Sequence, residues 1–366
     1  MTKRPAWLAA QTLLLIAAVA PSTRAAEITR RDDAYHFARE TDAQHAFSYA
    51  EWWYFNLSDP AQGLDLAMTY AVLDPANVSG TGVSAVTAIA YTPAGRFTET
   101  DVFPTTAFHA SDQQADVVIA RGSPLSLNYV DVLGDNLYRV VGSIEQQHRI
   151  SWNLLYLRRR DAWLTIDRQH VGRLPWEHMS WLPYMPAALV TGDVVIDGRR
   201  YPLNAARGYH DHNWGEWLPF DVVWNWAQYA EPGLDFAVGD FPNGGPGIVG
   251  LAVGNERTAF SKDQYAVVHA DWQYDAVNHV LYPTTTWIVA QNDRTTAIVA
   301  LGARGTIPVL PPPEVPLPLV PVIYEQNADV LGWLWEKNDV GDWTFVRAFG
   351  GRGFNEYTAV TFPPMQ

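Results

Sequence analysis

Hydrophobic residues recur along the chain in short alternating or continuous runs, and helical periodicity is scarce. Gly, Pro, Asn and Asp, which favour turns, separate the runs. Alternating polar and apolar side chains are typical of half-buried strands, and many short strands joined by turns favour a barrel or a sandwich. The pattern therefore predicts an all-β protein with little helix. The predicted strands include residues 52–57, 64–73, 84–91, 163–170, 190–196, 222–229, 236–241, 248–253, 285–290, 296–301 and 358–362.

A five-residue segment occurs twice in the chain. Gly63-Leu-Asp-Leu-Ala67 recurs as Gly233-Leu-Asp-Phe-Ala237, and each copy follows a run rich in tryptophan. A short match can arise by chance, but a genuine repeat indicates two copies of one β-domain. We therefore predict domains over residues 27–212 and 213–366. The proline-rich segment 308–318 cannot pair in a central strand and predicts an extended surface loop.

The N-terminal residues have the pattern of a secretory signal peptide. Lys3 and Arg4 precede the apolar run Trp7–Ala20, and small residues near Ala26 suit cleavage. We expect residues 1–26 to be a signal peptide and the protein to be exported, periplasmic or secreted; an uncleaved anchor is the alternative. No other run is long and apolar enough to predict an integral membrane span.

Two bulk properties narrow the function classes. The chain has no cysteine, which excludes thiol nucleophiles and cysteine-bound zinc. A net charge of −14 argues against nucleic acid or an anionic membrane as a partner. The 16 Trp and 17 Tyr suit strands and apolar pockets.

The segment Gly208-Tyr-His-Asp-His-Asn-Trp-Gly-Glu-Trp217 concentrates residues that carry chemistry. As a strand, it would send Tyr209, Asp211 and Asn213 to one face. His210, His212 and Trp214 would point to the other face. The segment is open to three interpretations.

The first two interpretations are a metal site and a hydrogen-bonded corner. His210 and His212 could bind a metal with Glu216 or His178, but the spacing fixes no third ligand. In the second interpretation, His212, Asn213 and Gly215 serve the fold, and Trp214 and Trp217 belong to the core.

The third interpretation is proton transfer by Asp211. Tyr209 and the tryptophans at 214, 217, 224 and 226 would shield this carboxyl from water, raise its pKa and keep it protonated near neutral pH. Such an acid could protonate an apolar, electron-rich substrate, and aromatic faces would stabilise the cation. No metal or cofactor is required.

Glu51-Trp-Trp-Tyr-Phe55, together with the segment 208–215, resembles the lipocalin-like family of bacterial carotenoid hydratases. Tocopherol-cyclase-like and fungal Diels–Alderase-like proteins look like more distant relatives. Residues 190–198 and 351–357 extend the resemblance. It implies two lipocalin-like β-barrels in tandem, an apolar site near their interface, and a Tyr-His-Asp segment that carries the acid, here Tyr209, His210 and Asp211. The family also uses an upstream His and Trp, for which Trp176, His178 and Trp181 are the nearest candidates.

These observations favour an enzyme that protonates a C=C bond of an isoprenoid or polyene lipid. Capture of the cation by water gives a hydratase, which is a lyase, and capture by an internal alkene gives a cyclase. A non-catalytic carrier of a hydrophobic ligand, a pericyclic cyclase and a secreted hydrolase remain alternatives, although no Gly-x-Ser-x-Gly elbow is present. Glu51 begins an otherwise apolar strand, so its carboxylate lies either at a barrel rim or buried with a partner, and it is a further candidate for the site. Trp52 and Trp53 face opposite ways. The residues predicted to bind substrate are Trp53, His178, Trp181, His212, Asn213, Trp214, Trp224 and Trp226.

Overall fold

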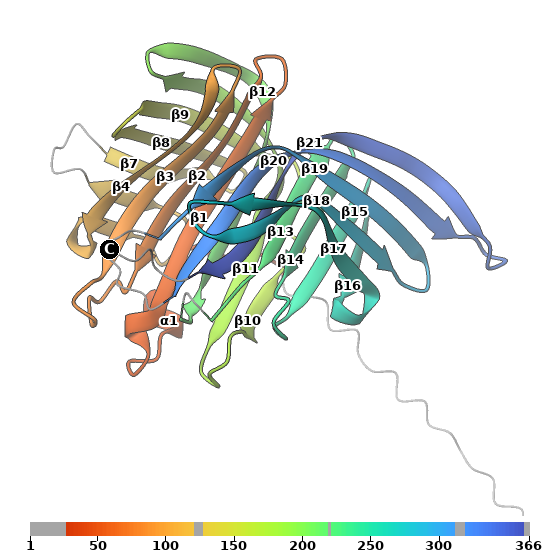
Figure 1. Ribbon diagram of the computed structural model, residues 1–366, viewed down its shortest axis with the longest axis horizontal. Helices are drawn as coiled ribbons and strands as arrows, with labels where there is room; N and C mark the ends of the chain where they lie inside the picture. Colours follow the sequence, from red (N-terminus) through yellow and green to blue (C-terminus); the bar gives the residue numbers. More distant parts are fainter. Residues whose placement is uncertain (1–26, 121–126, 219–220, 312–318, 362–366) are drawn as a thin grey trace, which may run out of the picture.

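The computed structural model describes residues 27–120, 127–218, 221–311 and 319–361. The predicted signal peptide and most of the proline-rich segment lie outside these residues. The described chain is almost entirely strand, with one four-residue α-helix, α1 (Phe37–Glu40), and three short 3₁₀ turns, η1 (Ala46–Ser48), η2 (Thr105–Ala107) and η3 (Lys262–Gln264). The strands form two barrel-like sheets, one nearly closed and one a half-barrel (Figure 1). The predicted fold class is confirmed.

The N-terminal sheet has the order β4-β3-β2-β1-β12-β11-β9-β8-β7-β6-β5, and β10 pairs with β11. All of its pairs are antiparallel, as expected for strands joined by short turns. Its strands are β1 (Tyr49–Asp59), β2 (Leu64–Leu73), β3 (Val83–Thr92), β4 (Gly95–Pro104), β5 (Phe108–Ala110), β6 (Val117–Ala120), β7 (Leu127–Gly134), β8 (Leu137–Glu145), β9 (Arg149–Arg158), β10 (Ile166–His170), β11 (His178–Ile196) and β12 (Arg199–Glu216).

The C-terminal sheet has the order β16-β15-β14-β13-β21-β20-β19-β18-β17. In both sheets the first strand therefore pairs with the second strand on one side and with the last strand on the other. The strands are β13 (Asn225–Glu231), β14 (Leu234–Asp240), β15 (Gly247–Val253), β16 (Glu256–Ser261), β17 (Tyr265–Asp275), β18 (Val280–Gln291), β19 (Thr295–Val309), β20 (Val320–Lys337) and β21 (Trp343–Thr361).

The short sequence repeat occupies the same place in both sheets. Gly63 and Gly233 end the turns of the hairpins β1–β2 and β13–β14, and both have a positive φ that favours glycine. The change of sheet falls between Glu216 and Asn225. The domain boundary predicted after residue 212 lies inside β12, because β12 continues to pair with β1 as far as Glu216.

Hydrophobic side chains form three cores. One fills the N-terminal barrel, one lies inside the C-terminal sheet, and the third is packed where the two sheets meet. Because side chains alternate along β1, this strand contributes to two of the cores. Trp53 and Phe55 lie in the core of the barrel, and Tyr54 lies in the core between the sheets.

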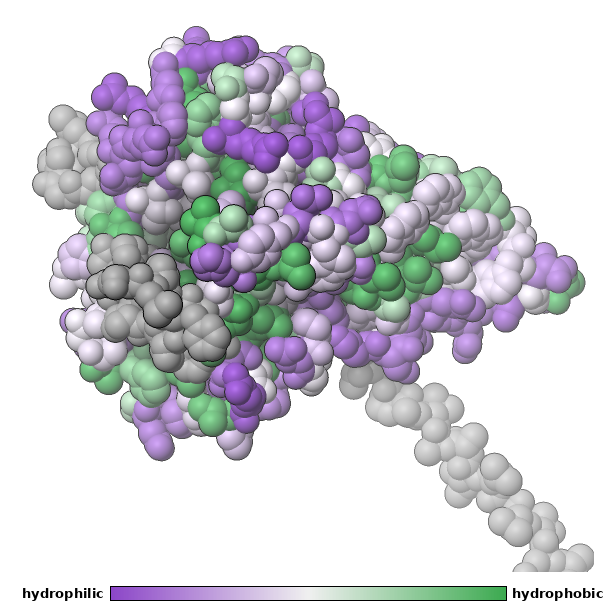
Figure 2. All heavy atoms as spheres, viewed as in Figure 1, coloured by the Kyte–Doolittle hydropathy of each residue, from purple (hydrophilic) through white to green (hydrophobic). Residues whose placement is uncertain are grey.

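Exposed hydrophobic side chains are concentrated on the C-terminal sheet, notably on β17, β18 and β21. Figure 2 shows hydrophobic residues among hydrophilic ones over this part of the surface. The described residues include no helix with the length and hydrophobicity needed to span a bilayer.

Candidate active site

Strand β12 carries Tyr209, Asp211 and Asn213 on the face that meets the C-terminal sheet. The Asp211 carboxyl is buried and accepts three hydrogen bonds. Oδ2 accepts the Trp181 Nε1–H at 2.8 Å and the Tyr209 hydroxyl at 2.8 Å, and Oδ1 accepts the Asn213 amide at 3.0 Å. The structure thus brings together four residues that the sequence analysis named.

The surroundings of Asp211 favour its neutral form. Burial raises its pKa to about 7, although the hydrogen bonds from Trp181 and Tyr209 act in the opposite direction. The charge of Glu356 adds to the rise. The carboxyl is therefore protonated in a large share of molecules at neutral pH, as an acid that donates a proton requires. Burial also raises the pKa of Tyr209 well above its usual range, so this phenol remains a hydrogen-bond donor.

The alternate residues of β12 point into the N-terminal barrel. His210 Nε2 lies 3.0 Å from Asp33 Oδ2, and His212 Nε2 lies 2.9 Å from Glu51 Oε1. The Trp53 ring stacks on His212 with centroids 4.4 Å apart. These side chains lie on the far side of the strand from Asp211, so the structure separates Trp53, His210 and His212 from the acid.

Two further predicted site residues also lie away from Asp211. Trp214 stacks on His36 and donates to Glu40 Oε2 at 2.7 Å, next to the N-terminal helix α1. His178 packs at the start of β11, where its Nδ1 lies 3.1 Å from the Trp176 carbonyl. Among the described residues, neither side chain lines the cavities next to the acid.

The barrel contains a group of possible metal ligands, but it differs from the predicted group of His210 and His212 with Glu216 or His178. The ligand atoms of His36, Glu51 and His212 lie within 4.8 Å of one another. Hydrogen bonds already engage Glu51, which accepts the Tyr49 hydroxyl at 2.6 Å and the His36 backbone N–H at 2.9 Å. Burial opposes protonation of His212, but hydrogen bonds to Asp33 and Glu51 outweigh it and raise its pKa. These contacts fit the hydrogen-bonded interpretation of His212, with Glu51 in a buried pair.

Two cavities lie between the sheets, and both have aromatic walls. The smaller one, of about 40 Å³, borders Asp211 and Asn213 and is walled by Trp52, Trp181, Trp224 and Trp226. The larger one, of about 210 Å³, is mainly apolar and is also lined by Trp52 and Trp224. Exposed Leu310 lines the larger cavity as well, so this cavity reaches the surface there. The structure places the predicted residues Trp181, Asn213, Trp224 and Trp226 in the lining.

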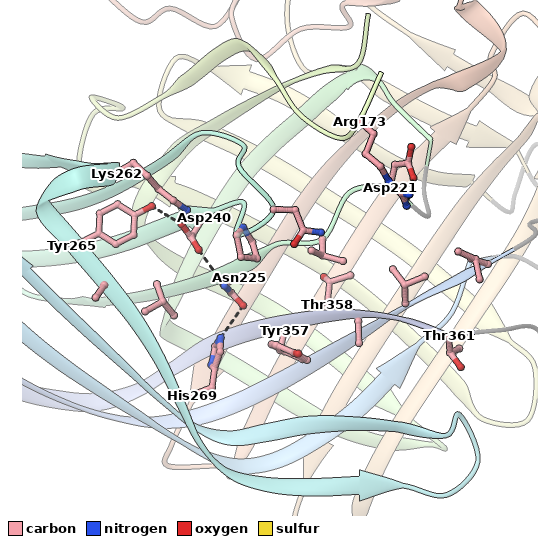
Figure 3. Close-up of a pocket in the computed structure, with 18 residues that line it drawn as sticks. Arg173, Asp221, Asn225, Asp240, Lys262, Tyr265, His269, Tyr357, Thr358 and Thr361 are labelled. Carbon is pink, nitrogen blue, oxygen red and sulfur yellow. Dashed lines mark hydrogen bonds and ion pairs between the residues drawn. The ribbon is translucent and has the colours of Figure 1, made fainter. Parts of the chain in front are cut away.

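A wide cleft of about 870 Å³ with a mixed polar and apolar lining opens along the C-terminal sheet, beside Arg173 and Asp221 (Figure 3). Hydrogen bonds run across it from Tyr265 to Asp240, from Asn225 to Asp240, and between Asn225 and His269. Asn225 and Asp240 also line the small cavity beside Asp211. The cleft thus borders the small cavity.

The sequence analysis missed two acidic residues at this site. Glu356 lines both cavities, and Glu325 lines the larger one and is buried. Glu325 follows the mostly apolar run 320–324, and a lone carboxyl in such a strand is a usable signal. Residues 351–357 were noted for their resemblance alone, and no chemistry was assigned to Glu356.

Neither family models nor curated proteins match the sequence. Solved structures that share the fold include the following two. A protein named as an AttH from Nitrosomonas europaea has a TM-score of 0.60 and 13% identity, covering 88% of this chain and 97% of its own. Kievitone hydratase from Nectria haematococca has a TM-score of 0.54 and 11% identity, covering 90% and 95%. Both alignments span the two sheets, so the tandem arrangement is shared.

Proposed function

We propose that this protein is a hydratase that protonates a C=C bond of an isoprenoid or polyene lipid and lets water capture the cation. One observation carries the proposal: a buried carboxyl with a pKa of about 7 faces a cavity walled by indole rings. A structural carboxylate is normally held ionised by charged or polar partners. Asp211 also accepts hydrogen bonds that favour its ionised form, but burial outweighs them and leaves a large share of the acid protonated at neutral pH.

The reaction follows from this placement. Asp211 transfers its proton to the less substituted carbon of the alkene, and positive charge develops on the more substituted carbon. The faces of Trp52, Trp181 and Trp224 attract that charge through their π-electrons. Water then forms a C–O bond and loses a proton, which gives a tertiary alcohol.

The cavities suit an apolar substrate that is held by one end. The larger cavity accommodates an apolar segment of the substrate, and its end then reaches Asp211 in the smaller cavity. The wide cleft that borders the smaller cavity offers a source of water. The name of one protein with the same fold, kievitone hydratase, is in keeping with hydration. A carrier would not need the neutral acid. If the predicted export occurs, the substrate is met outside the cytoplasm.

Incubation in D₂O tests the proposal. The purified protein would be mixed with geraniol, farnesol or squalene, and separately with a lipid extract of its host, and the products analysed by mass spectrometry. We expect a product that has gained one water and carries one non-exchangeable deuterium. A product of unchanged mass apart from deuterium would indicate cyclisation. Absence of any product from every substrate would overturn the proposal.

A further inference from the structure

Asp211 and Glu356 occupy equivalent positions in the two halves of the molecule. Asp211 in β12 pairs with Tyr54 in β1, and Glu356 in β21 pairs with Trp226 in β13. Tyr54 and Trp226 each lie five residues before the end of their strand, ahead of the repeated Gly-Leu-Asp turn. The duplicated fold thus supplies one carboxyl from each half.

The two halves meet face to face at these positions. Asn56 and Gln228 lie two residues beyond Tyr54 and Trp226, and the Gln228 Nε2–H donates to Asn56 Oδ1 at 3.0 Å. Tyr54 also crosses between the sheets, and its hydroxyl donates to Glu325 Oε1 at 2.9 Å. The carboxyls of Asp211 and Glu356 both line the small cavity that results.

Glu356 is held as a proton acceptor. It lies directly opposite Glu325 in the β20–β21 register, and the two carboxyls share a hydrogen bond. Burial and the nearby charge of Glu356 raise the pKa of Glu325 well above its usual range, so Glu325 holds the shared proton. Glu356 accepts that hydrogen bond and a second one from Trp224 Nε1–H at 2.8 Å. Burial nevertheless raises the pKa of Glu356, which makes it a stronger base than a solvated carboxylate.

The small cavity has room for water between the two carboxyls. Its volume of about 40 Å³ exceeds the roughly 10–15 Å³ that one water requires. The Trp226 Nε1–H is buried and makes no hydrogen bond of full geometry with the described residues, although it lies near enough to the Tyr209 hydroxyl to act on the pKa of that phenol. Trp226 lines this cavity, so a water or hydroxyl oxygen there is a ready acceptor for its N–H.

We propose that Glu356 is the base that takes a proton from the attacking water, while Asp211 is the acid that protonates the alkene. This assignment rests on the proposed hydratase function. Asp211 loses its proton to carbon, the water oxygen bonds to the cationic carbon, and the water proton passes to Glu356. The site keeps a single negative charge, which moves from Glu356 to Asp211. Burial disfavours the ionised Asp211 that results, so the proton then returns from Glu356 through cavity water to Asp211.

Glu356→Gln in D₂O separates the two steps. The assay uses whichever of geraniol, farnesol and squalene the wild type hydrates. Because the acid is intact, this variant still forms the cation from that substrate. The cation then loses a proton or deuteron instead of gaining water. We expect hydration to fall by about 10²-fold or more, while deuterium still appears in the recovered alkene. Glu325→Gln should lose less, because its amide can still donate a hydrogen bond to Glu356.

Each remaining outcome has a distinct meaning. Glu336→Gln is the matched control. Glu336 lies at an exposed position of β20, the strand that carries Glu325, and this variant should hydrate like the wild type. Circular-dichroism melting establishes that each variant is folded. A folded Glu356→Gln protein that hydrates normally, or that loses hydration and deuterium exchange together, would overturn the role of Glu356 alone. A wild-type protein that forms neither product nor exchanged alkene would overturn the hydratase function, and the base assignment with it.

Discussion

Replacing Asp211 by asparagine removes the transferable proton and preserves the shape of the site. The Asn oxygen can take the place of Oδ2 and accept from Trp181 and Tyr209. The new amide NH₂ then faces Asn213, whose own amide can rotate to present its oxygen. The variant therefore keeps three hydrogen bonds and should fold.

The expected loss of activity is large. Positioned general acids contribute about 10²–10⁴-fold to the rate. At roughly 1.4 kcal/mol per tenfold, this corresponds to about 3–5 kcal/mol of transition-state stabilisation. Hydration and carbon-bound deuterium exchange should both fall by that factor, because the acid precedes both outcomes.

The same substitution should raise the stability of the protein relative to the wild type as the pH rises. The pKa of Asp211 is about 7 in the folded protein against 3.8 in its ordinary state. Between these values the native state binds more protons than the unfolded state, so the stability contributed by this group is full below about pH 4 and is lost as the pH rises through 7. The loss is on the order of 4 kcal/mol. Asparagine has no such dependence, so Asp211→Asn should gain stability relative to the wild type between about pH 5 and pH 8.

Both quantities can be measured on the same preparations. Urea unfolding at the two pH values gives the free energies, and the D₂O assay gives the rates. Asp339→Asn, at an exposed position, is the control and should match the wild type in both. A variant that is destabilised to the same extent at both pH values, yet fully active when folded, would show that Asp211 braces the domain junction and does not donate a proton.

Three further predictions follow from the same geometry. Hydration by the wild type should decline as the pH rises above about 7, since Asp211 then loses its proton; a rate that increases steadily through that range would contradict the acid role. Gly239→Ala should slow hydration, because a Cβ there would lie 2.9 Å from the Trp181 ring, which donates to Asp211; unchanged kinetics would show that Trp181 need not be held in place. Activity should survive exhaustive dialysis against a chelator, whereas loss that a divalent ion reverses would direct attention to His36, Glu51 and His212.

Local alternation along the strand predicted the half of the site that lies on one strand. Tyr209, Asp211 and Asn213 share a face because strand residues alternate, and their hydrogen bonds show this. The same rule placed His212 and Trp214 on the opposite face. His212 and Trp214 were included among the substrate-binding residues because they are close to Asp211 in sequence. Neighbouring residues of a strand point to opposite faces of the sheet, so closeness in sequence does not place their side chains in one cavity.

The other half of the site depends on distant contacts. Glu325 and Glu356 reach the cavities only because β20 pairs with β21 and the C-terminal sheet packs on β1. No local pattern encodes that packing. The repeated Gly-Leu-Asp turn indicated two related halves, but the equivalence of Asp211 and Glu356 emerges only from the strand register.

The most direct test of the central claim is the position of deuterium in the product formed in D₂O. Protonation by Asp211 predicts one deuterium on the carbon next to the new carbinol carbon, which NMR of the purified alcohol would locate. An alcohol with no carbon-bound deuterium at that position would contradict proton transfer to the alkene as the first step.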